Sequence, residues 1–187
     1  VPGVGLAPTT AVACNNSLAG CLPTVDPIGT DKMYIGSIEA ATVNAPQSFE
    51  IHDRLAHMGN LNANTLVQGS TGSPLIDLSP LLETSNLDVR KGANNYSQVQ
   101  WWMEIFADCA NQARTVTVNA RFDDGTDADL TTFTPDSRMR PNQIYPLNNL
   151  IPAEKAGNYI RGINIVTLSA RNGNGLGNFF GFTATSY

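Results

Sequence analysis

The sequence predicts an all-β fold, a jelly-roll-like antiparallel β-sandwich with an extended N-terminal arm and one short helix. Apolar and polar residues alternate along several short segments, which is the pattern of strands with one buried face. Turn signals rich in Gly, Pro, Asn and Asp separate about seven or eight such segments, which is typical of sandwiches and jelly rolls. No strand–helix–strand pattern suggests a parallel sheet.

Length and composition narrow the class of protein. The 187 residues suit one domain with a proper core, and 42 % of them are hydrophobic. Charged residues make up only 14 %, against a usual value of roughly 25 %. The net charge is −5 and the eleven Lys and Arg are scattered, which argues against a nucleic-acid partner. No apolar run approaches the ~20 residues that span a bilayer, so we expect no membrane partner.

Residues 1–30 are expected to form an extended arm, and residues 31–187 the sandwich domain. Prolines at positions 2, 8, 23 and 27 exclude a helix or a sheet interior, yet the segment is apolar, which is unusual for a disordered tail. An arm that packs on a neighbouring subunit explains both properties, and a leader wrapped on its own domain is the alternative. The expected partner-binding side chains in the arm are Val4, Leu6, Val12, Leu18 and Leu22.

The three cysteines, Cys14, Cys21 and Cys109, do not have the spacing of a zinc site. Cys14 and Cys21 are close enough in sequence for a small loop disulfide, but two free thiols are the commoner arrangement.

After the arm, residues 32–42 have strand character. The next segment predicts one or two helical turns between Ser48 and Gly59. Ser48 can cap a helix, Ile51 and Leu55 are four residues apart, Met58 follows three later, and Gly59 suits the C-terminal position. Residues 60–95 are expected to be mostly loop, with a short strand or helical turn.

The clearest strand pattern lies between Ser97 and Asp124. One run alternates from Val99 to Ala107 and a second from Thr115 to Arg121, so we expect two half-buried strands. The short connection between them, 109–114, permits a hairpin or a tight corner. The turn at 123–126 should close the second strand and lead to a third at 130–133. This meander is the expected core of the sheet.

Two further strands are expected near the C-terminus. Residues 161–170 form a nearly continuous apolar run, which suits a strand covered on both faces. Residues 179–187 should place Phe180 and Phe182 on one side and Phe179 and Gly181 on the other.

Two clusters contain residue types that can bind a metal ion. His52, Asp53 and His57 could supply zinc ligands, but HExxH spacing is absent, and an Asp and a His that brace a short helix are commoner. A second cluster surrounds a glycine in the segment DDGTDAD, and consists of Asp123, Asp124, Asp127 and Asp129. Its twelfth position, Thr134, is not the Glu of an EF-hand, and aspartates are usual in turns. We therefore predict no metal and no other cofactor.

No catalytic constellation is visible, and we expect that the chain is not an enzyme. The GxSxG elbow is absent, and the GNGLG segment at 173–177 leads into a strand rather than into a phosphate-binding helix. Trp101 and Trp102 could form a sugar-stacking platform, but one Trp in the core and the other, Trp102, at an interface is the favoured interpretation.

Three stretches resemble a group of tailed-bacteriophage virion proteins: IHDRLAHMGNL at 51–61, WWMEIFADCANQARTVTVNARFDDGT at 101–126, and residues 138–184. The resemblance implies a jelly-roll-like capsid cement or decoration protein, made in the host cytoplasm and bound on the outer capsid surface. It also implies the major capsid protein and further copies of the chain, as a trimer or dimer, as partners. The longer, cysteine-containing N-terminal region departs from that group.

Other functions remain open at this point. One is a carbohydrate- or receptor-binding virion domain that uses an exposed Trp102 or Tyr96. Another is a main capsid subunit. A third is a metal-dependent hydrolase centred on His52, Asp53 and His57.

Overall fold

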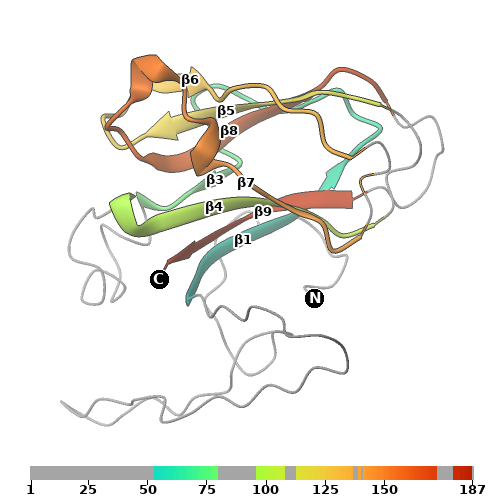
Figure 1. The fold of residues 1–187 in the computed structure, drawn as a ribbon, viewed down its shortest axis with the longest axis horizontal. Helices are drawn as coiled ribbons and strands as arrows, with labels where there is room; N and C mark the ends of the chain where they lie inside the picture. The colour runs from blue at the N-terminus through green and yellow to red at the C-terminus, as the bar shows by residue number, and fades with distance from the viewer. Residues whose placement is uncertain are drawn as a thin grey trace, which may run out of the picture.

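The computed structural model describes residues 53–79, 96–107, 113–136, 139, 141–171 and 179–186, and the account below is limited to them. These residues form two antiparallel β-sheets that pack against each other as a sandwich (Figure 1). The all-β sandwich predicted from the sequence is therefore confirmed. The predicted arm at 1–30, the strand at 32–42, and Cys14, Cys21 and Cys109 lie outside the described residues.

One sheet has four strands in the order β1-β9-β4-β7. The bounds of these strands are Asp53–Asn62 for β1, Phe179–Ser186 for β9, Val99–Ile105 for β4 and Ile144–Pro146 for β7. The second sheet has five strands, with the order β2-β8-β5-β6 and β3 also paired to β8. Their bounds are Val67–Gly69, Ile160–Leu168, Val116–Phe122, Asp127–Asp129 and, for β3, Ile76–Asp77.

Three short 3-10 helices lie in the connections. They are η1 (Tyr96–Gln98), η2 (Asn148–Leu150) and η3 (Ala153–Lys155). In Figure 1 the layer with β5, β6 and β8 lies above the layer with β1, β4 and β9.

The helix predicted between Ser48 and Gly59 is wrong for the part that the structure describes, because residues from Asp53 onward form strand β1. Leu55, Met58 and Leu61 are buried at intervals of three, which resembles a helical stripe. The pairing of β1 with β9 shifts register twice, before Ala56 and again between Met58 and Leu61. Each irregularity inserts residues into the strand and returns an apolar side chain to the core face, so a bulged strand mimics helical spacing.

The alternation in β4 and β5 is confirmed, because every second residue of each strand is buried. Their pairing as a meander is wrong, since β4 pairs with β9 and β7, whereas β5 pairs with β8 and β6. The chain crosses from one sheet to the other between them. The hairpin turn at 123–126 is confirmed, but the strand after it is Asp127–Asp129, and ladder contacts continue to a bridge between Phe133 and Val116.

The core lies between the two sheets and consists of their inward-facing apolar side chains. Trp101 on β4 is fully buried, and its Nε1 donates a hydrogen bond to the carbonyl oxygen of Ile160 on β8 at 2.9 Å. This bond ties the two sheets together and leaves no buried indole N–H without an acceptor. The predicted core Trp is thus confirmed.

Strands β8 and β9 are both present, as predicted, but the faces of these strands that are buried differ from the prediction. On the outward side of β8, Thr167 is exposed and Arg161 and Ile165 are partly buried, so this side of the strand is only partly covered. Strand β9 lies between β1 and β4, and from Phe180 to Ser186 it is buried on both sides. Its outward residues are small, so larger side chains on the neighbouring strands can cover them.

Candidate functional site

The outer face of the four-stranded sheet carries Trp102 and is called the Trp102 face here. Register places outward-facing residues of all four strands side by side, because Thr183 on β9 lies between His57 on β1 and Trp102 on β4. The Trp102 face comprises Arg54, His57, Gln100, Trp102, Glu104, Phe106, Ile144, Pro146, Thr183 and Thr185.

Two hydrogen bonds fix the large rings at the centre of this face. Trp102 Nε1 donates to Thr185 Oγ1 at 2.9 Å, and His57 Nδ1 lies 2.8 Å from Thr183 Oγ1. The two threonines are only 3 % (Thr183) and 8 % (Thr185) exposed, although they point away from the core. The centre of the outer face is therefore dry, whereas the outer face of an antiparallel sheet is commonly solvated.

Phe106 lies on two glycines at one end of the Trp102 face. A Cβ at Gly181 would lie 2.9 Å from Phe106 Cε2 and 2.0 Å from the carbonyl oxygen of Met58, so only glycine fits there. A Cβ at Gly59 would lie 3.4 Å from the same ring carbon. The ring also meets His57 edge to face, with 5.4 Å between centroids. The glycines thus allow an aromatic ring to lie against the sheet backbone.

His57 is uncharged at neutral pH. Burial of the imidazole, with a smaller contribution from the nearby Arg54 charge, lowers the pKa of His57 from 6.5 to about 4. The charged side chains of the Trp102 face are then Arg54 and Glu104. Ile144, on the edge strand β7, is 56 % exposed, and Pro146 beside it is exposed too. The face is therefore largely uncharged and partly apolar.

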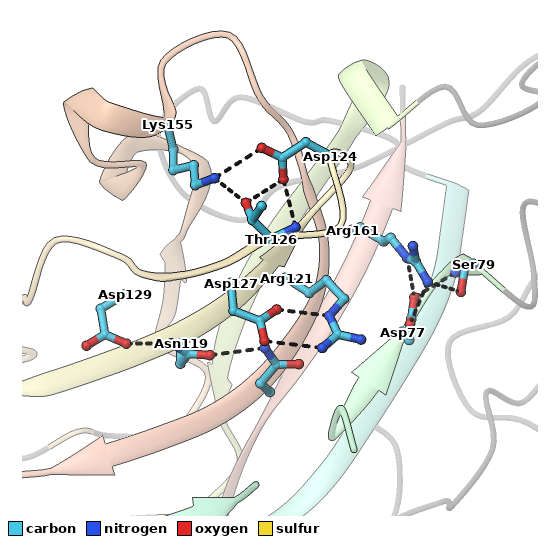
Figure 2. A network of polar contacts seen from close by, with 11 residues as sticks. Asp77, Ser79, Asn119, Arg121, Asp124, Thr126, Asp127, Asp129, Lys155 and Arg161 are labelled. Carbon is cyan, nitrogen blue, oxygen red and sulfur yellow. Dashed lines mark hydrogen bonds and ion pairs between the residues drawn. The ribbon is translucent and has the colours of Figure 1, made fainter. Parts of the chain in front are cut away.

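The outer face of the five-stranded sheet has the opposite character, and we call it the ion-pair face (Figure 2). Arg121 on β5 donates from Nε and Nη2 to the two carboxylate oxygens of Asp127 on β6, at 2.9 and 3.2 Å. Arg161 on β8 binds Asp77 on β3 in the same two-pronged way, at 3.1 and 3.2 Å. The ion-pair face comprises Asp77, Asn119, Arg121, Asp127, Asp129 and Arg161.

The four aspartates of the DDGTDAD segment do not share a ligand site, because each has its own partners; Figure 2 shows this for Asp124, Asp127 and Asp129. Asp123 accepts from the backbone N–H of Tyr159 at 3.0 Å. Asp127 pairs with Arg121, and Asp129 accepts from Asn119 at 2.7 Å.

Asp124 closes the turn at the end of the β5–β6 hairpin. The Thr126 hydroxyl and backbone N–H donate to its carboxylate, and Lys155 pairs with it at 3.0 Å and also contacts the Thr126 hydroxyl. These hydrogen bonds, those from Thr126 first, lower the pKa of Asp124 from 3.8 to about 2. The segment is a structural turn, as aspartates in turns commonly are.

Among the described residues, no group of three His, Cys, Asp or Glu could hold a metal ion. His52 and the 173–177 loop lie outside the described residues. His57 faces Thr183, whereas Asp53 is paired with Ser186 at the start of β1. Of the two histidines in this cluster, the structure describes only His57, and its imidazole contacts the hydroxyl of Thr183.

Of the predicted partner-binding residues, Trp102 lies half-buried on the outer face, and Val4, Leu6, Val12, Leu18 and Leu22 lie outside the described residues. Tyr96 is only 3 % exposed, so its predicted use as an exposed recognition residue is wrong. Sequence reasoning missed His57 as a partner of Thr183, and it missed Ile144. Both lie beside Trp102 through long-range strand pairing, which leaves no local signal in the sequence.

Comparison with protein-family models, with curated proteins and with solved structures finds no match to this chain. Among the residues that the structure describes, no helix has the length and apolar character needed to cross a membrane.

Proposed function

We propose that this chain is a structural virion protein of a bacteriophage, a capsid cement or decoration protein that binds and stabilises the shell of major capsid protein. The observation that carries the proposal is the order of the strands. If β2 and β3 count as one interrupted strand, the eight strands form four nested pairs: first with eighth, second with seventh, third with sixth, and fourth with fifth. A long antiparallel ribbon wound into two sheets would give this order, which supports the proposal of a jelly roll.

Jelly rolls occur in viral capsid and lectin domains and in cupins. The space between the two sheets is filled with apolar side chains, among them Trp101, Phe122, Phe180 and Phe182, which favours a packed structural domain over a cupin-like interior cavity. The resemblance to tailed-phage virion proteins that the sequence suggests for three stretches is the reason for proposing a capsid function among these. The low charge of the Trp102 face suits burial against protein.

The mechanism is passive. Each copy clamps adjoining shell subunits, so that outward pressure must break its contacts as well as those of the shell. Many weak contacts suffice, because linked contacts on a lattice raise the overall avidity. A trimer or dimer with rotational symmetry would match a lattice axis on the outer capsid surface.

The test is co-sedimentation of the purified full chain with capsid shells that lack it. We expect saturable binding at a fixed ratio to the major capsid protein, and a higher melting temperature of the loaded shells. Absence of binding to any shell from a tailed phage would overturn the proposal. Closed shells formed by the purified chain alone would instead identify a main capsid subunit.

A second candidate, a carbohydrate- or receptor-binding domain, is favoured by the half-exposed indole of Trp102 and by the occurrence of jelly rolls in lectins. It predicts a glycan that raises the melting temperature of the free chain, with the effect lost in Trp102→Ala. A glycan screen without any such shift would remove this candidate.

A further inference from the structure

We propose that the Trp102 face is the docking surface for the N-terminal segment, residues 1–30, of a neighbouring copy of this chain. The inference rests on the proposed function in one respect, since exchange of a segment between copies requires copies held side by side. It adds to that function by naming both partners of a contact between subunits.

The first argument is the contrast between the two outer faces. On the ion-pair face two arginine–carboxylate pairs hold four of the charges, and Asp129 accepts a hydrogen bond from Asn119, so this face is suited to contact with water (Figure 2). The Trp102 face carries exposed Ile144 and Pro146 beside the half-buried rings of Trp102 and Phe106. The outer face of the five-stranded sheet carries Val67 on β2, which is as exposed as Ile144 at 56 %, but the other large side chains there are mostly polar. Burial of apolar surface is favourable by about 25 cal/mol per Å², so the Trp102 face, with its two large rings and Ile144, gains more from being covered.

The second argument is the chemistry of the segment. Residues 1–25 contain no Asp, Glu, Lys, Arg or His, and Asp26 is the first charged residue. Residues 1–25 therefore bring no charged side chain to a face whose own charged members are Arg54 and Glu104, and taking further charges out of water would be costly. The four prolines at 2, 8, 23 and 27 cannot donate to a strand ladder, so the segment is suited to lie across a face through its side chains rather than to extend a sheet edge.

The third argument is reach. The chain that precedes the described residues ends at Asp53, where β1 begins, and β1 is the edge strand of the sheet that carries the Trp102 face. Residues 31–52 lie between this segment and β1, and a chain of roughly 20 residues spans at most ~70 Å. A domain of this size has a diameter of only ~40 Å. The segment can therefore reach the same face on an adjacent copy.

The test uses the chain's own arm cysteines. One background retains Cys21, with Cys14→Ser and Cys109→Ser, and a second retains Cys14 in the same manner. Each receives either Ile144→Cys on the Trp102 face or, as matched control, Thr167→Cys at an exposed position on the outer side of β8. Both sites lie on strand surfaces outside the core, and circular dichroism checks that each variant folds.

Equal amounts of isotopically labelled and unlabelled full-length protein are mixed and treated with a short bismaleimide at several concentrations. We expect covalent dimers and higher species with Ile144→Cys, in which mass spectrometry finds an arm peptide of one isotope joined to the β7 peptide of the other. The Thr167→Cys control should give only background linkage. Linkage confined to single chains, equal yields on the two faces, or no linkage would each overturn the proposal.

The outcome is separable from that of the proposed function. Isotopically mixed linkage without any binding to shells would support the exchange of the segment between copies and would reject the proposed capsid function. Binding to shells with linkage only inside single chains would do the reverse.

Discussion

Acidification should weaken the fold through His57, and the variant His57→Gln should remove this effect. The imidazole is largely buried on the Trp102 face, where burial and Arg54 lower its pKa from 6.5 to about 4. Glutamine can still reach the hydroxyl of Thr183, which the His57 ring contacts at 2.8 Å, but it does not titrate. The variant therefore isolates the protonation of one side chain.

The sign follows from proton linkage. Between pH 6.5 and 4 the unfolded chain binds a proton at this histidine and the folded chain does not, so acid favours unfolding. Stability from this source is complete above pH 6.5 and is lost as the pH falls to about 4. A shift of this size corresponds to about 3 kcal/mol. Because the ring keeps some contact with water, we reduce the expected loss to about 1–2 kcal/mol.

Urea unfolding of both proteins, followed by tryptophan fluorescence at several pH values from 7.5 to 4, measures the effect. The difference in unfolding free energy between wild type and His57→Gln should change by the stated amount across this window. Other titrating groups, such as Asp124, cancel in the difference. Parallel pH profiles for the two proteins would refute the inference that the ring is buried and neutral.

Three further variants test the packing by urea unfolding at pH 7. Gly181→Ala should lower the free energy of unfolding by about 3 kcal/mol, because the new Cβ would lie 2.0 Å from a backbone oxygen of β1. Gly157→Ala is the control: its Cβ meets open space, so only the left-handed φ of 92° should matter, at about 1 kcal/mol. Equal losses in the two variants would contradict the close approach of β1 and β9. Trp101→Phe should lower the free energy of unfolding by about 2 kcal/mol, because the carbonyl oxygen of Ile160 loses the indole donor. Unchanged stability would argue against this hydrogen bond between the sheets. Asp77→Ala should lower the free energy of unfolding by about 1 kcal/mol, and the loss should be smaller at high salt, because the ion pair with Arg161 is partly exposed. A loss that does not depend on salt would point to packing instead.

Local patterns in the sequence were sufficient for β4 and β5. Trp101 and Trp102 are adjacent, so an extended chain must turn them to opposite sides, and the prediction of one core and one outer Trp required no knowledge of the partner strands. The same reasoning failed at β1, because its register shifts give Leu55 and Met58 a helical spacing. Irregular insertions in a strand leave the same apolar intervals as a helix.

Pairing between strands could not be predicted in this way. Trp102 lies opposite Thr183, and β4 and β5 belong to different sheets although they are neighbours in sequence. The aspartates near Gly125 looked like one cluster, but Asp124 and Asp127 are drawn apart by Lys155 and Arg121. Those partners come from other positions in the chain, so spacing alone overstated the likeness to a calcium loop.

The position of β9 has a consequence for synthesis of the protein. Among the described strands, β9 joins β1 to β4, and residues 63–178 separate the end of β1 from the start of β9. On a translating ribosome the backbone edge of β1 that pairs with β9 waits on the order of 10 s for this partner. Contacts over such sequence distances also slow folding after release. A nascent chain halted before Phe179 should therefore stay open to chaperones and proteases, and the four-stranded sheet should close in a single late step.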